Sequence, residues 1–168
     1  MNPLSMPLRS RLLLPLLLAS LCPAAAATAA RPDPHVGVLL EQLGYDYEVD
    51  EDGDYKLVVP VDGEGRTQLV YVRSPVETFG HHRIREIWSP AYASPSGAFP
   101  GPVANRLLEA SNDLKLGAWV KQGPHAVFVV KIDARAAAAE LDEAISAAVS
   151  SADGMEQELA GDPASDEY

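Results

Sequence analysis

The residues best suited to chemistry in this chain are two adjacent histidines, His81 and His82, with Glu77 and Glu86 on either side of them. Imidazole and carboxylate groups bind zinc and related metals, and the same groups act as general acids and bases. Side chains of neighbouring residues diverge on an extended chain, however, and no third ligand stands at a suitable spacing. We therefore favour an exposed turn, and keep a hydrolase or metal-dependent enzyme using His81, His82 and Glu86 as the alternative hypothesis.

A run of carboxylates between Asp46 and Asp54 raises the question of a calcium site. An EF-hand loop placed on this run would have Val59 at its twelfth position, where a bidentate carboxylate is needed. The flanking residues also have the pattern of strands, whereas an EF-hand needs helices. The Asp52-Gly53 pair is typical of a two-residue hairpin turn, so we interpret the run as a solvated hairpin tip.

Covalent and phosphate chemistry have no sequence signature here. The single cysteine, Cys22, lies near the N-terminus, and there is no G-x-S-x-G nucleophile motif. Gly63 and Gly65 do not stand between a strand and a helix, as a phosphate-binding loop requires. The sequence therefore predicts no catalytic residue, no metal and no cofactor.

Large aromatic side chains are the best candidates for a binding function. The segment 89–102 contains four prolines, and we expect it to form a long irregular loop that carries Tyr92 and Phe99. Trp88 lies just before this loop, and Trp119 lies in a later predicted strand. Aromatic side chains often anchor protein interfaces, and long loops often carry function. The predicted partner-binding residues are Trp88, Tyr92, Phe99 and Trp119.

The orientation of Trp119 is predicted from the alternation of its neighbours. Leu116, Ala118 and Val120 alternate along the strand and are expected to face the core. This phase directs Trp119 to the outer face, between two lysines, where it is open to a partner. The residues predicted to lie at the centre of the core are Leu69, Leu116, Phe128 and Ile145.

The N-terminal residues have the order of a secretory signal peptide. Two arginines precede a short apolar run over 12–21, and small residues follow up to Ala30. The run is about half the length that a membrane span needs. We expect cleavage after Ala30, with Ala27 as a second candidate, and a periplasmic or secreted protein with no stable membrane insertion after cleavage. A lipoprotein acylated at Cys22 is disfavoured because a leucine precedes this cysteine.

The mature chain is expected to be strongly acidic. Removal of residues 1–30 leaves 11 basic and 24 acidic side chains, a formal charge of −13. A surface of this sign repels nucleic acid and anionic lipid, so we expect neither as a partner.

Hydrophobic periodicity divides the mature chain into helices and strands. A helix over Pro34–Leu43 is favoured because Asp33 is a good N-cap and Gly44 a good stop. The other expected elements are strands over 45–49, 55–61, 67–74, 84–88, 115–121 and 126–132, a helix from Pro102 to Asp113, and a helix over 136–153. Hairpin connections favour a mainly antiparallel sheet, so the predicted fold class is α+β, in the order α-β-β-β-β-α-β-β-α with helices packed on the sheet. The domain is expected to span 31–155, followed by an acidic disordered tail over 156–168.

Four segments carry a family resemblance: LLEQLGYDYEVDEDGDYKL (39–57), TQLVYVRSPVE (67–77), REIWSPA (85–91) and NRLLEASNDLKLGAWVKQGPHAVFVVKI (105–132). Together they resemble the bacterial YbjN family, described as sensory transduction regulators. That family shares its fold with the small chaperones of type III secretion. The resemblance implies a type III secretion chaperone-like fold, no defined enzymatic activity and a homodimer. The export signal is a departure from the usual member.

These observations together favour a non-enzymatic exported protein that binds another polypeptide, in a chaperone-like or regulatory role. The expected partner is a protein or a peptide, and a homodimer is possible.

Overall fold

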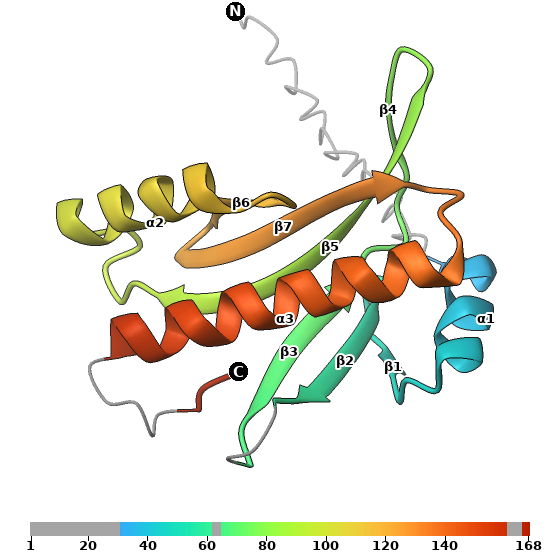
Figure 1. The fold of residues 1–168 in the computed structure, drawn as a ribbon, viewed down its shortest axis with the longest axis horizontal. Coiled ribbons are helices and arrows are strands. Elements are labelled where there is room, and N and C mark those ends of the chain that lie inside the picture. The colour runs from blue at the N-terminus through green and yellow to red at the C-terminus, as the bar shows by residue number, and fades with distance from the viewer. Residues whose placement is uncertain (1–30, 62–64, 161–165) are drawn as a thin grey trace, which may run out of the picture.

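A computed structural model describes residues 31–61, 65–160 and 166–168 of the chain (Figure 1). The predicted signal peptide, Cys22 and both cleavage positions lie outside the described residues, as do residues 161–165 of the predicted acidic tail. None of the helices in the described ranges is long and apolar enough to cross a bilayer.

The fold is α+β, and its described residues form three helices and a seven-stranded antiparallel sheet. The strand order is β1-β2-β3-β5-β7-β6, and β4 pairs with β5 outside this order. The elements are α1 (Pro34–Leu43), β1 (Glu48–Val49), β2 (Tyr55–Pro60), β3 (Thr67–Val72), β4 (Glu77–Phe79), β5 (His82–Ala93), α2 (Gly101–Asp113), β6 (Ala118–Gln122), β7 (His125–Asp133) and α3 (Ala138–Ala160). The predicted fold class and order are confirmed, with β4 as an additional short strand.

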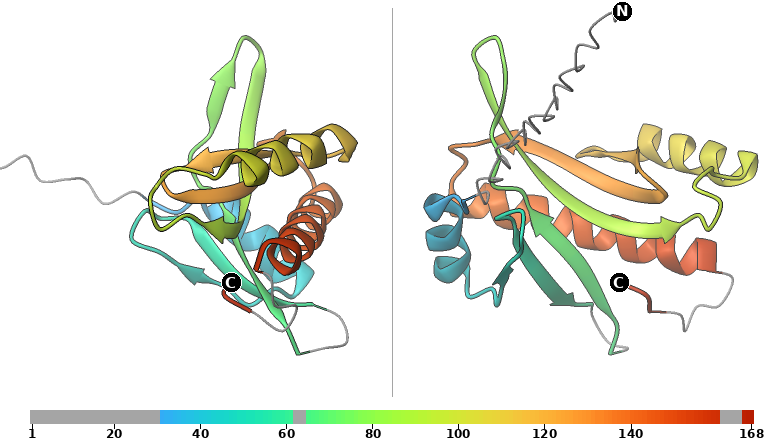
Figure 2. Two further views of the ribbon diagram at one scale, coloured as in Figure 1. Left: turned by 90° about the vertical axis from the view of Figure 1, so that its left-hand side faces the viewer. Right: turned by 180° about the vertical axis from the view of Figure 1, so that it is seen from behind.

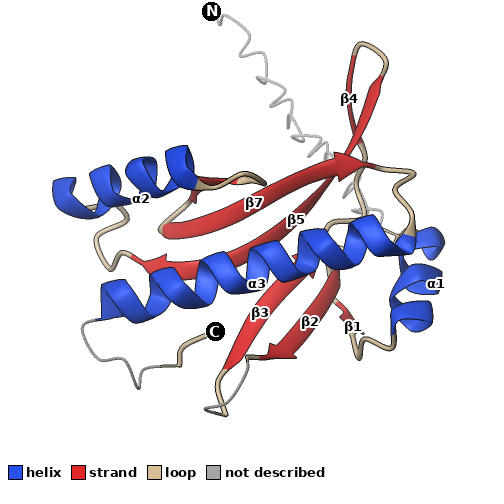
Figure 3. Ribbon diagram, in the orientation of Figure 1, coloured by secondary structure: helices blue, strands red, loops and turns tan. Residues whose placement is uncertain are grey.

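The helices lie on one side of the sheet. α3 runs along this face, α1 lies beside one end of it, and α2 lies at the β6 edge (Figures 1 and 2). Seen from behind, the other face of the sheet is not covered by any helix of the described residues (Figure 2, right), whereas α3 crosses in front of the sheet in Figure 3. The core therefore forms between α3 and the sheet, where Val70, Ile87 and Ile145 are fully buried.

The first helix begins and ends where the sequence predicts. Asp33 caps α1 by accepting a hydrogen bond from His35 N at 3.0 Å, and Pro34 occupies the first turn, where no intrahelical donor is needed. Gly44 ends the helix with a φ of 77°, and its N–H donates back to the last turn. The predicted bounds of this helix are confirmed. They could be predicted because the residues that set them act within one turn of the chain.

The last helix is longer than predicted. The sequence predicts that it ends at residue 153, ahead of Gly154, but α3 continues to Ala160. A glycine inside a helix costs roughly 1 kcal/mol relative to alanine. The next two residues, Met155 and Glu156, are buried in the domain, and their contacts offset this cost.

Strand β5 is 12 residues long and includes 89–93, which the sequence analysis assigns to an irregular loop. Pro90 pairs with Val127 of β7, and the register shifts between Pro90 and Tyr92. β3 pairs with β5 only as far as Trp88, so no third strand requires the N–H that proline lacks. The loop prediction is therefore wrong for 89–93.

The predicted orientation of Trp119 is also wrong. Trp119 is 7% exposed, and its ring lies against Phe128 with the centroids 5.3 Å apart. Leu116 and Ala118 are exposed, so the apolar alternation marks the sheet face without helices. Gly117 makes room for this packing, because a Cβ at its position would lie 2.7 Å from Phe128 Cζ.

Of the four residues predicted to lie at the centre of the core, two are buried and two are not. Phe128 and Ile145 are fully buried, as predicted. Leu69 is only partly buried on the helix-free face, and Leu116 is 39% exposed. The prediction of a core position is wrong for these two leucines, because period-two alternation does not reveal which face α3 covers.

Candidate functional site

The histidines of the alternative hypothesis do not meet Glu86. His81 and His82 are exposed at the turn between β4 and β5. Glu86 instead accepts a hydrogen bond from Trp88 Nε1 at 2.8 Å and pairs with Lys131 Nζ at 3.1 Å. Within the residues that the structure describes, no three His, Cys, Asp or Glu side chains are grouped to hold a metal ion. The hydrolase or metal-enzyme hypothesis therefore has no assembled site in this part of the chain.

The acidic run forms a hairpin tip between β1 and β2. Asp50 Oδ1 accepts hydrogen bonds from the backbone N–H groups of Asp52 and Asp54, at 3.0 and 2.9 Å. The loop is longer than the predicted two-residue turn, because the strands end at Val49 and resume at Tyr55. The carboxylate of Asp50, which could otherwise bind a calcium ion, thus closes the turn.

Buried polar side chains gather where α1 meets the sheet, in a group that we call the α1 polar cluster. Arg85, 3% exposed, donates to Asp33 Oδ2 at 2.5 Å and to the carbonyl oxygen of Arg73 at 2.6 Å. Asp54, fully buried, accepts from Ser74 N at 2.6 Å and pairs with Arg73 at 2.9 Å. These groups face one another and the backbone rather than an open cavity.

The electrostatics of the α1 polar cluster match a structural role. Burial alone would raise the pKa of Asp33, but the N–H of His35 and the guanidinium of Arg85 outweigh burial and lower this pKa. Burial raises the pKa of Asp54, and the hydrogen bond from Ser74 N only partly opposes that shift. Since both carboxylates are held by internal partners, the cluster positions α1 rather than a substrate.

The four predicted partner-binding residues lie on both faces of the sheet. Tyr92 and Phe99 stack edge to face with centroids 5.7 Å apart, and Phe99 lines one hollow together with Trp119. Trp88 lies on the helix-free face, where the guanidinium carbon of Arg73 is 4.3 Å from the ring centroid. The structure therefore brings Tyr92, Phe99 and Trp119 to one region and places Trp88 in another.

A large apolar hollow lies between α2, the 97–99 segment and β6, and we call it the α2–β6 groove. Its volume is about 590 Å³. Leu108, 67% exposed, lines the groove together with Phe99 and Trp119. The full lining consists of Gly97, Ala98, Phe99, Ala104, Leu107, Leu108, Trp119, Val120 and Lys121. A hollow of this size and composition accepts apolar side chains.

The walls of the α2–β6 groove are fixed by contacts within the domain. Arg106 of α2 donates to both carboxylate oxygens of Glu158 on α3, at 2.5 and 2.7 Å. Ser111 Oγ of α2 accepts a hydrogen bond from Trp119 N at 2.9 Å. Trp119 Nε1 is buried without an acceptor among the described residues. The groove is therefore formed before any partner is present.

A fork between β3 and β5 opens a second hollow on the helix-free face. The two strands pair at only two positions, and the last pair before they separate is Tyr71 with Trp88. Beyond this pair, Gln68 Nε2 bridges the strands by donating to Ser89 Oγ at 3.1 Å and to Pro90 O at 2.8 Å. The fork lets side chains from both strands face a common space.

We call this second hollow the β3–β5 cleft. Its volume is about 260 Å³. Its lining consists of Leu69, Tyr71, Trp88, Pro90, Gln122, His125, Val127 and Tyr168. One of these residues, Tyr168, comes from the segment beyond α3 and not from the sheet.

No protein-family model and no curated protein matches the chain. The resemblance to the bacterial YbjN family therefore stays a prediction from the sequence.

Sequence reasoning missed two features of these hollows. Leu108 is a neighbour of the buried Leu107, and a single leucine outside the apolar stripe of a helix carries no signal by itself. Asp166 contacts Thr67, 99 positions away in sequence, and no local pattern predicts a contact at that separation.

Proposed function

We propose that the mature protein binds another polypeptide through the α2–β6 groove, in a chaperone-like or regulatory role without catalysis. The observation that carries the proposal is Leu108, which is 67% exposed beside an apolar hollow with aromatic walls. Burying a leucine side chain contributes about 1.5–3 kcal/mol. A partner segment that covers Leu108 and enters the groove gains this contribution.

The rigidity of the groove supports this role. The Arg106–Glu158 pair and the Ser111–Trp119 hydrogen bond already hold α2 against α3 and β6. Ordering a side chain at an interface costs about 0.5–1.5 kcal/mol, so a formed groove binds with less of this loss.

The charge of the protein defines the chemistry of the partner. The mature chain carries 11 basic and 24 acidic side chains. Fields of this sign attract basic polypeptides and repel acidic ones. The partner that fits is therefore a segment with apolar side chains for the groove and basic residues on either side of them.

Export is part of the same proposal. The N-terminal segment has the pattern of a signal peptide, so the protein is placed in the periplasm or outside the cell. N-terminal sequencing of protein from the envelope fraction should then begin near Arg31. An intact chain starting at Met1 and recovered from the cytosol would contradict export.

The proposed binding is tested with protein lacking residues 1–30 on an array of peptides that vary in apolar content and charge. We expect capture of peptides that combine apolar and basic residues. Leu108→Asp should remove this capture, because it places a charge at the groove. Val38→Asp is the matched control, since Val38 is a 61% exposed helical residue at the other end of the domain.

Two outcomes would contradict the proposal. One is capture that Leu108→Asp and Val38→Asp reduce equally, since the effect would then come from charge alone. The other is the absence of any captured peptide. A second copy of the chain is the alternative occupant of the groove, and sedimentation would show it as a dimer that Leu108→Asp dissociates.

A further inference from the structure

Residues beyond α3 return to the sheet on the face opposite the helices. Tyr168 lines the β3–β5 cleft together with Leu69, Tyr71, Trp88 and Pro90. The right-hand view of Figure 2 shows the C-terminal end between β5 and β3. Burial, followed by the charges of nearby carboxylates, raises the pKa of Tyr168, in agreement with a partly buried ring.

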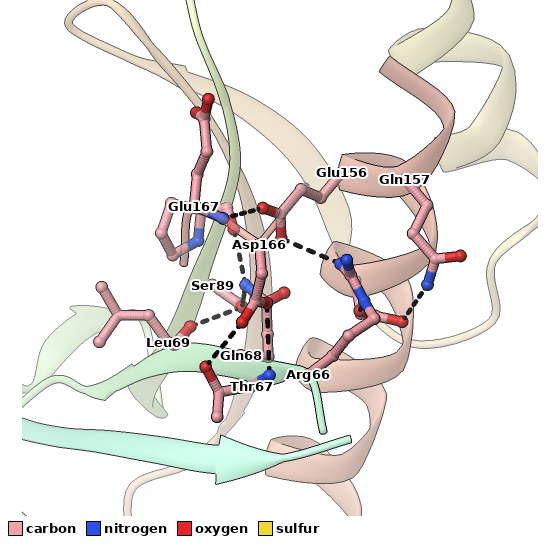
Figure 4. Close-up of polar contacts among 11 residues, drawn as sticks. Arg66, Thr67, Gln68, Leu69, Ser89, Glu156, Gln157, Asp166 and Glu167 are labelled. Carbon is pink, nitrogen blue, oxygen red and sulfur yellow. Dashed lines mark hydrogen bonds and ion pairs between the residues drawn. The ribbon is translucent and has the colours of Figure 1, made fainter. Parts of the chain in front are cut away.

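This segment is anchored to the folded domain through the carboxylate of Asp166 and the backbone N–H of Glu167 (Figure 4). Asp166 accepts hydrogen bonds from Thr67 N at 3.3 Å and from Thr67 Oγ1 at 3.4 Å. Glu167 N donates to Glu156 Oε1 at 2.6 Å. The segment therefore meets both the first residue of β3 and the last turns of α3.

The acceptor for Glu167 N is part of a buried ionic group. Glu156 is 2% exposed, and its other carboxylate oxygen lies 3.6 Å from Arg66. Arg66 is also held by Asp153, with Nε to Oδ1 at 2.8 Å. A carboxylate fixed in this way has a defined position before the segment arrives, which is the property of a built binding site.

The cleft is formed mainly by residues of the sheet. Gln68 is fully buried and bridges the fork between β3 and β5, because its Nε2 donates to Ser89 Oγ and to Pro90 O. The side chains that face the fork are mainly apolar, and one of them is the ring of Trp88. Without Tyr168 the domain would expose this apolar surface to water.

We propose that the β3–β5 cleft is a second peptide site, which takes an aromatic side chain two positions after an aspartate, and that residues 166–168 occupy it as an intramolecular ligand. The aromatic ring packs against the cleft and forms one of its walls, the aspartate meets Thr67, and the intervening N–H meets Glu156. The cleft lies on the helix-free face of the sheet, Glu156 belongs to α3, and neither belongs to the lining of the α2–β6 groove.

Trp88 provides a built-in reporter of this site. The chain has two tryptophans, so Trp119→Phe leaves Trp88 as the only one. In this background, a variant ending at Ala160 and the point variant Tyr168→Ser should both shift Trp88 emission to longer wavelength, because its ring becomes wetter. Glu167→Gln is the matched control and should leave the emission unchanged, because the contact of residue 167 is made by its backbone N–H.

Binding in trans completes the test. A capped peptide of residues 160–168 should restore the emission of the shortened variant in a saturable way, and the same peptide with serine in place of the tyrosine should not. The full-length chain should bind the peptide more weakly than the shortened variant, since its own segment competes at an effective concentration of about 1 mM; the loss is about tenfold if the peptide binds the shortened variant with a Kd of about 0.1 mM. If Trp119→Phe does not fold, anisotropy of a labelled peptide gives the same comparison without it.

The proposal is overturned if shortening the chain leaves Trp88 emission unchanged, or if the peptide does not bind the shortened variant at up to about 1 mM. It is also overturned if the serine peptide binds as well as the tyrosine peptide. None of these results bears on peptide capture by the α2–β6 groove, so failure of one proposal is distinguishable from failure of the other.

Discussion

The two ends of the domain are held by different kinds of interaction. At the α1 end, Arg85 and Asp54 are almost fully buried and meet Asp33, Arg73 and Ser74 through hydrogen bonds and ion pairs of 2.5–2.9 Å. At the α2 end, apolar contacts dominate, and Leu108 and the α2–β6 groove remain open. The same sheet thus has one end whose polar groups are engaged internally and one end with unused apolar surface.

The difference separates a structural end from a binding end. Hydrogen bonds are directional, so a donor or acceptor engaged inside the α1 polar cluster is lost to any partner. Apolar contact is non-directional and proportional to area, so a wall that packs α2 can also pack a partner segment. An abundance of buried charged groups is therefore a poor guide to the functional region of this protein.

The largest effect is expected at the core beneath the α2 end. Phe128 is fully buried and supports Trp119, so Phe128→Ala should lower the free energy of unfolding by about 3–5 kcal/mol. Val58→Ala is the control, because Val58 is 56% exposed and its loss should cost less than about 0.5 kcal/mol. Chemical denaturation measures both. A loss below about 1 kcal/mol for Phe128→Ala would mean that the α2 end is not packed as described.

A somewhat smaller effect is expected at the α1 end. Arg85→Ala removes a buried guanidinium and leaves Asp33 without its ion pair. The free energy of unfolding should fall by about 3 kcal/mol. This value is the lower part of the range for a broken buried pair, because Asp33 is partly exposed. Arg135→Ala is the matched control, since its pair with Asp133 is exposed and should contribute less than about 1 kcal/mol. If the two variants unfold at the same denaturant concentration, the polar cluster does not hold this end.

The same contrast explains how much of the fold could be predicted from the sequence. The bounds of α1 follow from Asp33, Pro34 and Gly44, which act within one turn of the chain. The orientation of the side chains of β6 could not be predicted in this way, because alternation identifies the two faces of a strand but not the face that α3 covers. Trp119 therefore belongs to the inner wall and not to a free outer face.

The candidate site was predictable only in part. Aromatic character predicts a binding role for Phe99 and Trp119, and both line the α2–β6 groove. Trp88 belongs to the β3–β5 cleft because β3 and β5 separate after it, and a fork between two strands has no sequence signature. The contact of Asp166 with Thr67 likewise depends on how the ends of β3 and α3 meet in space.

An effect of about 1 kcal/mol, the usual net contribution of a hydrogen bond, is expected from Tyr45 at the α1 end. Its hydroxyl donates to Asp142 Oδ1 at 2.7 Å and thereby joins the segment that follows α1 to α3. Burial, followed by this hydrogen bond and the charge of Asp142, raises the pKa of Tyr45 to about 12. A raised pKa in the folded state means that the stabilisation is fully present below about pH 10 and is lost as the pH rises toward about 12.

Tyr45→Phe measures this contribution. The variant should be less stable than the wild type at neutral pH, and the difference should shrink between about pH 10 and 12. The difference in absorbance at alkaline pH between wild type and variant reports the titration of Tyr45 itself. A difference in stability that does not change over this range would show that the hydroxyl is not a coupled donor at the α1 end.

The smallest effect on stability, and the sharpest test of the comparison, is expected from Leu108→Asp and Val38→Asp. Both residues are exposed on helices, at 67% and 61%, so each substitution should change the free energy of unfolding by less than about 0.5 kcal/mol. The two variants should differ in the binding of an apolar, environment-sensitive dye, because only Leu108 lines a groove. A loss of about 1.4 kcal/mol of apolar contact corresponds to about tenfold weaker dye binding for Leu108→Asp, against no change for Val38→Asp. Equal dye binding by the two variants would mean that the α2 end offers no more usable apolar surface than the α1 end, and the division into a structural end and a binding end would not hold.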